Sequence, residues 1–368
     1  MSNKRIGIIT IDDYENLGNR LQNYAVQSIL NDYGNVETID SNLHYVHSKS
    51  LLHYFKYIGK LKVKKLFHYH YVKSPYEKNR QNNFKEFNKN IKFGYKIGRL
   101  KSKTINKKYD YFAIGSDQIW NLDFCANTYI SFAKFADKTK NIAVSPSIGK
   151  SKLNSEHETI IKESLKNINY LSCREQQGSD IITSLAGREC TTLIDPTLML
   201  SSDEWDKVSK KPVFHNENDK YILLYFLGEM TKEYKDIINN ISKRYNLKVI
   251  DIYDKNSKYY TCGPSEFIYM IKHCSIMLTD SFHGSVFSYI YNKPFRIFKR
   301  IDSIQSMNSR LENLINVLHL SNDIYINIDT FDIEHVLDEP NYDKTILENE
   351  QKKFKDYLDK AFKENSND

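Results

Sequence analysis

The stretch "TDSFHGSVFS", residues 279–288, holds the side chains in this sequence whose types and spacing are best suited to chemistry. It ends the apolar run "SIMLT" and places Ser281, His283, Gly284 and Ser285 before apolar residues resume. Histidine is the natural proton donor near neutral pH, and N–H groups of Gly284 and Ser285 at a helix start would suit a phosphate. We predict a catalytic acid, His283, beside an anion site. The alternative, a lone structural histidine, stays open.

Three basic residues downstream are candidates to bind a charged substrate. Lys299, Arg300 and Arg310 follow the next apolar run, "PFRIF". An arginine forms bidentate bonds with carboxylates and phosphates, whereas a lysine supplies a point charge. If their loops fold over His283, these cations would meet an anionic ligand there.

A second polar group ends the apolar run in "FAIGSDQIWN". Its members are Ser116, Asp117, Gln118, Trp120 and Asn121. Asp117 is a candidate acceptor for the proton of a substrate hydroxyl, and equally a candidate helix cap. Trp120 is a candidate for stacking on a sugar or for packing in the core, and both roles are compatible. The other three side chains are predicted to bind substrate.

The first loop between a strand and a helix supplies further candidates. In "DDYENLGNRLQNYA", Asn16, Gly18 and Asn19 lie in that loop, and Gln22 lies one turn into the helix. Backbone N–H groups at the helix start make a site for an anion or a hydroxyl. A glycine turn with an asparagine cap is the structural alternative.

Arg174 and Glu175, in "LSCREQQGSD", follow another apolar run. An arginine in that position is suited to a bidentate bond with a carboxylate or phosphate. A surface pair between the two residues, or a salt bridge between domains, is the alternative. We favour ligand binding by both.

The runs that carry these residues predict the fold. Strand-like runs at "RIGIIT", "YDYFAIGS" and "KNIAVSPSIG" alternate with helical patterns, which predicts an α/β protein with largely parallel sheets. The pattern restarts at "KYILLYFLG", so we predict two Rossmann-like domains. A cleft between them would be lined by residues that follow the strands.

The predicted domain bounds follow from composition. We expect an N-terminal domain over 1–205, a C-terminal domain over 206–335 and an amphipathic helix over 336–368. The polar stretch 201–220, which contains Pro212, is the predicted linker between the domains.

Composition excludes several classes of protein. No apolar run approaches the roughly 18 residues that a membrane-spanning helix needs, and the first residues reach Asp12 and Asp13 too early for a signal-peptide core. Five widely spaced cysteines without a C-x-x-C pair indicate neither a disulfide framework nor a zinc site. A cytoplasmic location is therefore expected.

The segment 41–108 is strongly basic. It holds eighteen Lys or Arg against Glu77 and Glu86, with twelve Tyr or Phe among them. Basic and aromatic residues are mixed in this way where proteins dock on an anionic membrane surface. A solvated basic face is an equally weighted alternative. Nucleic acid is not expected, because no recognisable binding motif accompanies the charge.

Five stretches in this order, "GNRLQNYA", "AIGSDQIWN", "SCREQQGSDII", "IDPTLML" and "LTDSFHGSVFSYIYNKPF", resemble the polysaccharide pyruvyl transferase family. The resemblance covers approximately residues 5–320. It implies a fold similar to the glycosyltransferase-B type, with the N-terminal domain on the acceptor side and the C-terminal domain on the donor side. It also implies phosphoenolpyruvate as co-substrate and a lipid-linked or nucleotide-linked sugar as acceptor, giving a pyruvate ketal on a precursor of a surface polysaccharide of the cell envelope, such as a capsule or exopolysaccharide.

The resemblance implies roles for the residues singled out above. His283 would protonate the methylene carbon of the donor or the departing phosphate, and Arg174 and Arg310 would hold its carboxylate and phosphate. Asp117, or alternatively Glu175, would accept the hydroxyl proton. No metal or cofactor is needed, because arginines and helix-start N–H groups can neutralise the phosphate.

One position departs from the family pattern. Better-known members carry an arginine two residues before the motif histidine, where this chain has Ser281. Lys299, Arg300 or Arg310 would have to take over that charge. Two further functions therefore stay open: a glycosyltransferase that uses a nucleotide-sugar, and a non-catalytic binding member of the family. An acceptor carried on a polyprenyl diphosphate would place the enzyme peripherally at the inner face of the plasma membrane.

Overall fold

The computed structural model describes residues 4–11, 15–40, 74–97, 102–125, 127–301 and 308–363. The chain divides into two compact units. Unit 1 comprises Met1–Ser74, Ile91–Pro196 and Lys353–Asp368, and unit 2 comprises Pro75–Asn90 and Thr197–Lys352.

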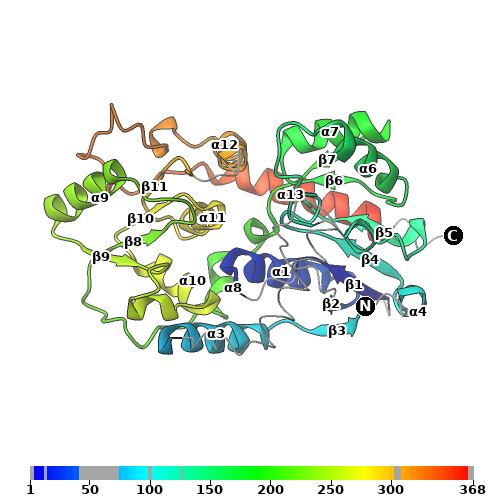
Figure 1. Ribbon diagram of the computed structural model, residues 1–368, viewed down its shortest axis with the longest axis horizontal. Coiled ribbons are helices and arrows are strands. Elements are labelled where there is room, and N and C mark those ends of the chain that lie inside the picture. Colours follow the sequence, from blue (N-terminus) through cyan, green and yellow to red (C-terminus); the bar gives the residue numbers. More distant parts are fainter. Residues whose placement is uncertain are drawn as a thin grey trace, which may run out of the picture. The chain divides into compact units, whose positions relative to one another are not determined.

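Unit 1 is built on a parallel sheet whose strand order is β3-β2-β1-β4-β5 (Figure 1). Its strands are β1 Arg5–Ile9, β2 Asn35–Asp40, β3 Phe93–Lys96, β4 Tyr111–Ile114 and β5 Asn141–Ala143. A bridge from Ile142 to Tyr170 leads on to the short strands β6 Ser172–Cys173 and β7 Thr191–Thr192. The order reverses between β1 and β4, and ligands of Rossmann-type sheets bind beyond the carboxyl ends of strands at such a switch point.

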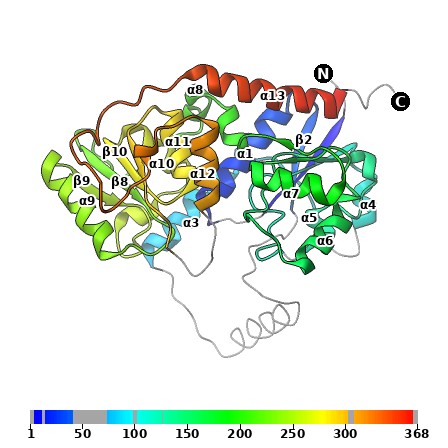
Figure 2. The same ribbon diagram turned by 90° about the horizontal axis from the view of Figure 1, so that it is seen from above.

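The helices of unit 1 begin and end where the sequence provides caps. Asn16 caps α1 (Leu17–Leu30) by accepting the N–H of Asn19, and Asn154 caps α6 (Ser155–Leu165) in the same way. The helix α7 (Gln176–Ala186) lies beside α6 and ends at Gly187, whose positive φ of 65° favours glycine (Figure 2). Ile161 and Leu165 of α6 are buried in the core on the sheet.

Unit 2 contains a second parallel sheet, in the order β11-β10-β8-β9. Its strands are β8 Tyr221–Tyr225, β9 Lys248–Asp251, β10 Ile276–Thr279 and β11 Phe295–Ile297. The helix α9 (Lys232–Tyr245) packs its buried Ile238 and Ile241 on one face, where Ile222 and Leu224 lie. On the other face, α10 (Pro264–His273) accepts a hydrogen bond from Tyr221 and α11 (Phe282–Ile290) packs against β10. The switch point of this sheet lies between β8 and β10.

The other helices and the 3-10 turns complete the two units. They are α3 Pro75–Asn88, α4 Ser102–Asn106, α5 Thr128–Ser131, α8 Ser202–Asp206, α12 Asn308–Val317 and α13 Lys344–Lys363, with 3-10 turns η1 Lys138–Lys140, η2 Pro196–Met199, η3 Lys258–Thr261 and η4 Asn322–Ile324.

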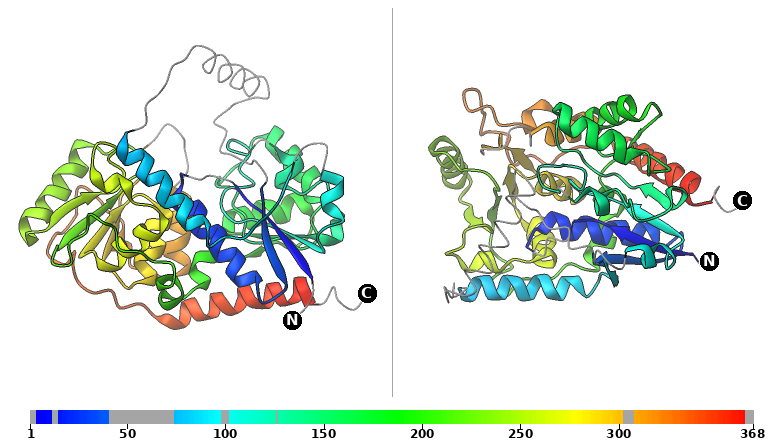
Figure 3. Two further views of the ribbon diagram at one scale, coloured as in Figure 1. Left: turned by 90° about the horizontal axis from the view of Figure 1, so that it is seen from below. Right: turned by 45° about the vertical axis from the view of Figure 1, so that its right-hand side comes forward.

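The units differ from the predicted domains at two places. The helix α3 was expected with the N-terminal domain, but it packs on η3 and α10 of unit 2 (Figure 3, cyan). The cause is Arg80, which is buried, donates to the carbonyls of Tyr260 and Cys262 at 3.2 and 2.6 Å, and stacks on the ring of Tyr260. Residues 353–363 of α13 belong to unit 1, where the Tyr357 hydroxyl donates to the carbonyl of Ala143.

The linker was predicted over 201–220, and the predicted position of its start is wrong. The chain passes into unit 2 between Pro196 and Thr197. Ser201 then forms a capping box with Glu204, and Trp205 is fully buried against Phe287 of α11. The rest of the stretch is largely polar, so its composition did not indicate that Trp205 would be buried.

Candidate functional site

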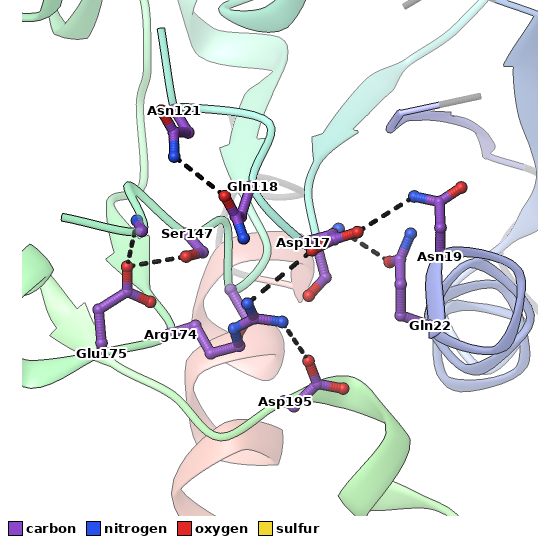
Figure 4. Close-up of polar contacts among 12 residues, drawn as sticks. Asn19, Gln22, Asp117, Gln118, Asn121, Ser147, Arg174, Glu175 and Asp195 are labelled. Atoms are coloured by element: carbon purple, nitrogen blue, oxygen red, sulfur yellow. Dashed lines mark hydrogen bonds and ion pairs between the residues drawn. The ribbon is translucent and has the colours of Figure 1, made fainter. Parts of the chain in front are cut away.

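Asp117 lies at the centre of a buried polar network at the switch point of unit 1. It follows β4 with a positive φ of 63°, a conformation that Asp adopts more readily than most residues. Its Oδ2 accepts a 3.3 Å hydrogen bond from Nδ2 of Asn19, on the helix that follows β1, and its Oδ1 lies 3.9 Å from Nη2 of Arg174 (Figure 4). The predicted residues after β1, β4 and β6 are therefore brought together.

Arg174 is bound more closely by a carboxylate that sequence analysis did not select. Its Nη1 donates a 2.6 Å hydrogen bond to Oδ2 of Asp195, and both side chains are buried. Although burial lowers it, the carboxylates of Asp195, Asp117 and Glu175 raise the pKa of Arg174 above its usual value. The alternative of a surface pair between Arg174 and Glu175 does not hold, because both side chains are buried. Instead Arg174 joins two strand ends inside unit 1.

The residues after β1 form the second side of this network. Gln22 accepts the N–H of Ser116 at 3.2 Å and donates to Thr10 at 2.9 Å, so it ties the ends of β1 and β4 together. Asn16 is the helix cap, as its structural alternative proposed. Gly18 lies buried in the first turn of α1.

Glu175 belongs to a neighbouring set of contacts (Figure 4). Its Oε1 accepts two hydrogen bonds of 2.8 Å, from the hydroxyl of Ser147 and the N–H of Gly149. Asn121 donates to Oε1 of Gln118 at 2.9 Å. Ser147 and Gly149 were not predicted, since the loop after β5 offers no side-chain signal beyond small residues.

Trp120 lies in the core. It is fully buried, stacks on Phe132 with ring centroids 5.0 Å apart, and donates its indole N–H to the carbonyl of Ser131. Of its two predicted roles, the structure favours packing.

His283 lies in the first turn of α11 in unit 2 and is 7% exposed. The prediction for the N–H groups beside it needs correction. Ser281 caps α11, so its Oγ accepts the N–H of Gly284, and the Ser285 N–H donates to the Ser281 carbonyl. Both groups are used within the helix. Gly284 is required for packing instead, because a Cβ there would lie 2.7 Å from Oγ1 of Thr279.

Asp280 links two loops at the switch point of unit 2. Its two carboxylate oxygens accept the N–H groups of Leu227 and Gly228, each at 2.7 Å, in the loop after β8. Burial raises the pKa of Asp280, although those two N–H groups and the cation of Arg300 oppose the rise. Gly228 is needed because a Cβ would lie 2.9 Å from both Oδ2 of Asp280 and Cγ of Arg300.

The three predicted cations of unit 2 differ in burial and in distance from the switch point. Arg300 lies beside Asp280 at this switch point, as the contacts at Gly228 show. Lys299 is exposed, and its carbonyl accepts the hydroxyl of Tyr234. Arg310 is buried in α12, which packs against α11.

The described part of the basic segment uses several of its cations internally. Lys92 and Lys96 pair with Glu37 and Asp40, Lys108 lies over the ring of Tyr95, and Arg80 is buried. Residues 41–73, which contain seven of the lysines and all five histidines of this segment, lie outside the described residues.

The described residues contain neither a cluster of metal ligands nor a helix that could span a membrane. Within these ranges, no three His, Cys, Asp or Glu side chains gather as metal ligands would. No helix described here is both long and apolar enough to cross a membrane.

Comparison with solved structures confirms the expected fold class. A UDP-GlcNAc 2-epimerase of Methanocaldococcus jannaschii has a TM-score of 0.57 at 13% identity, with 96% of this chain and 99% of that chain covered. A protein of Listeria monocytogenes described as a UDP-N-acetylglucosamine 2-epimerase has a TM-score of 0.53 at 8% identity, with 99% and 98% covered. The chain is therefore an α/β protein with two Rossmann-like domains, similar to the glycosyltransferase-B type.

The family is defined by sequence. The model of the polysaccharide pyruvyl transferase family matches residues 16–303, and the chain belongs to this family. A comparison with curated protein sequences finds no match. The matched range contains Asp117, Arg174, Glu175, Asp280 and His283, and it ends before Arg310.

Proposed function

We propose that this protein transfers the pyruvyl group of phosphoenolpyruvate to two hydroxyls of one sugar in a surface-polysaccharide precursor. Family membership supports polysaccharide pyruvyl transfer in general. The donor and the ketal product are the proposed specifics. They are supported by one observation: the charged side chains at the switch point of unit 2 differ from those at the switch point of unit 1.

The donor is proposed to bind to unit 2. Phosphoenolpyruvate carries a carboxylate and a phosphate, so its site needs cations and an acid. Unit 2 provides His283 at the start of α11 and Arg300 beside the loop after β8. Lys299 is next to Arg300 and is exposed. Arg310 is on α12, which packs on the helix of His283.

The acceptor is proposed to bind to unit 1. Three buried carboxylates, those of Asp117, Asp195 and Glu175, lie there with two buried guanidinium groups, those of Arg174 and Arg20. A site with more buried carboxylates than cations disfavours a phosphate, because like charges repel. It favours neutral hydroxyls, which donate hydrogen bonds to carboxylate and amide oxygens.

The reaction balances without a further reagent. The methylene carbon of phosphoenolpyruvate takes a proton from His283 and becomes a methyl group, while one sugar oxygen bonds to the adjacent carbon and loses its proton. The second sugar oxygen then displaces phosphate from that carbon and loses its proton in turn. The products are a cyclic pyruvate ketal and inorganic phosphate, with the charge that develops at the carbon balanced by nearby cations.

A glycosyltransferase that uses a nucleotide-sugar is the second candidate. It is favoured by one observation: the similar solved structures include a complex of the M. jannaschii UDP-GlcNAc 2-epimerase with UDP-GlcNAc and UDP, at 13% identity and a TM-score of 0.51. Asp280 argues against it, because its carboxylate takes two N–H groups at the switch point where a diphosphate would bind.

The deciding experiment measures phosphate release from phosphoenolpyruvate with a panel of lipid-linked and nucleotide-linked sugars. We expect release that depends on one acceptor, stabilisation of the protein by phosphoenolpyruvate in thermal unfolding, and loss of turnover in His283→Ala. His335→Gln, at an exposed histidine of unit 2, is the matched control and should keep full activity. Stabilisation by a nucleotide-sugar alone, with no phosphate release, would instead favour glycosyl transfer. Binding of phosphoenolpyruvate that His283→Ala leaves intact, without turnover in any case, would indicate a non-catalytic member.

A further inference from the structure

We infer that Glu175, rather than Asp117, accepts the proton of the acceptor hydroxyl. This inference rests on the proposed function and assigns one step of it to one carboxylate. Both residues lie at the carboxyl edge of the sheet of unit 1 and both are buried. They differ in how their carboxylate oxygens are used.

Asp117 is committed to the network that surrounds it. Its Oδ2 accepts from Asn19 and its Oδ1 faces the guanidinium of Arg174. The positive φ at Asp117 and the hydrogen bond from the Ser147 N–H to its carbonyl fix it further. Asp117 therefore has the contacts of a positioning residue for Asn19 and Arg174.

Glu175 has a different arrangement. The hydroxyl of Ser147 and the N–H of Gly149 both bind Oε1, which holds the carboxylate in one orientation. Oε2 has no hydrogen-bond partner among the described residues, and the residue is only 5% exposed. A buried carboxylate oxygen without a partner is costly unless a ligand supplies one. Glu175 is also the residue before α7, yet its side chain does not cap that helix.

The surroundings of Glu175 fit a sugar hydroxyl. Gly149, whose N–H binds Glu175, has a φ of 65°, and a Cβ on it would lie 3.0 Å from Nδ2 of Asn121 and from Oε1 of Gln118. The amide pair, from the loop after β4, and the carboxylate, from the loop after β6, therefore both lie beside Gly149. Amides and carboxylates with fixed orientation are the groups that recognise sugar hydroxyls by donating and accepting hydrogen bonds. The absence of a Cβ keeps the space between them open.

The step is a simple proton transfer coupled to bond formation. The O–H bond of the acceptor breaks, its proton moves to Oε2 of Glu175, and its electron pair forms the new bond to the central carbon of phosphoenolpyruvate. The alkene electron pair takes a proton at the methylene carbon. One proton enters and one leaves the reacting pair, so charge is conserved. A positioned base contributes about 10²–10⁴-fold to such a rate.

The test compares Glu175→Gln with wild-type enzyme in the acceptor-dependent release of phosphate from phosphoenolpyruvate. Gln keeps an oxygen for Ser147 and Gly149 but cannot take a proton. We expect kcat to fall by about 10²–10⁴-fold, the KM for phosphoenolpyruvate to stay within about threefold, and the acid limb of the kcat–pH profile to disappear. Glu189→Gln, an exposed glutamate of the same unit, is the matched control.

The outcomes separate this inference from the function it rests on. If wild-type enzyme turns over and Glu175→Gln keeps a kcat within about threefold with its acid limb, only the inference is overturned. If wild-type enzyme releases no phosphate with any acceptor, both are overturned. If Glu175→Gln fails to fold, Ser147→Ala is the second test of the inference. It removes the hydroxyl that donates to Oε1 of Glu175, so the carboxylate is no longer held in one orientation. A fall in kcat of roughly tenfold with an unchanged donor KM supports the inference, and wild-type kcat overturns it.

Discussion

Arg174 and Asp195 form a buried ion pair, with Nη1 donating to Oδ2 at 2.6 Å, and they come from loops that follow the neighbouring strands β6 and β7. This pair fixes the guanidinium on which Asp117 also depends. Arg174 was predicted to bind a ligand, and in the structure it also has a buried carboxylate partner inside its own unit. The pair is therefore expected to stabilise unit 1 and to orient the site at once.

We predict that Asp195→Ala destabilises unit 1 by about 3–5 kcal/mol, because it leaves a buried guanidinium without its nearest carboxylate. The chain has two tryptophans, Trp120 in unit 1 and Trp205 in unit 2. Urea unfolding followed by Trp120 fluorescence in a Trp205→Phe background therefore measures unit 1 alone. Glu163→Ala, which removes the exposed pair with Lys166, should leave the midpoint unchanged. Equal shifts in the two variants would contradict the prediction.

We predict that Asp280→Asn weakens the connection between the loops after β8 and β10. An amide has one acceptor oxygen, so its NH₂ group must face the N–H of either Leu227 or Gly228. Leaving a buried donor unpaired costs about 1–3 kcal/mol. Hydrogen exchange read by mass spectrometry should show faster exchange over 226–229 in the variant, with exchange in β9 unchanged. Protection at wild-type levels would show that the carboxylate is not needed there.

We predict that the stability difference between wild-type protein and Asp280→Asn depends on pH. Burial raises the folded-state pKa of Asp280 above the unfolded value. Its contribution to stability is therefore fully present below the unfolded pKa of about 3.9 and is lost as pH rises through the folded pKa. Because Asn does not titrate, the advantage of wild-type protein over Asp280→Asn in thermal midpoint should shrink as pH rises from about 4. An advantage that grows with pH would show that the N–H donors outweigh burial.

The sequence predicted the strands and the polar residues that follow them, because apolar runs and their small polar ends are local signals. Asn19, Asp117 and Arg174 were selected in this way and do come together. Asp195 was missed although it lies in a motif that was noticed. Its partner is 21 residues away, and pairing across that distance is set by the order of the strands. The cap formed by Ser281 was missed for a different reason, since a serine before a helix serves a cap or a ligand equally well.

We predict that none of the five cysteines reacts with Ellman's reagent in the folded protein. All five are buried and free of disulfide bonds. Burial raises the pKa of Cys190 and of Cys274 to about 12 and raises that of Cys173 and Cys262 well above the usual value, which removes the reactive thiolate. Five thiols should titrate after denaturation in guanidinium. A thiol that reacts rapidly before denaturation would contradict this burial.

We propose that residues 41–73 dock the protein on anionic membranes, as a lipid-linked acceptor would require. The prediction concerns Lys62, Lys64 and Lys65, which lie outside the described residues. Their reversal to Glu should abolish sedimentation with vesicles of anionic lipid, because each basic residue near such a surface contributes about 1 kcal/mol. Lys78→Glu with Lys85→Glu, on α3, is the control that changes charge elsewhere. Sedimentation that survives the triple reversal would refute docking by this segment.

Because unit 1 includes the end of α13, it can be completed only late in the synthesis of the chain. Tyr357 of α13 donates to the carbonyl of Ala143 across 214 residues, and Phe354 and Leu358 of the same helix are fully buried. At translation rates of about 5–20 residues per second, α13 leaves the ribosome on the order of 10–40 s after β5. Throughout that interval the nascent first domain exposes the apolar surface that α13 will cover. Chaperone occupancy on the ribosome should therefore persist until long after the first sheet has been translated.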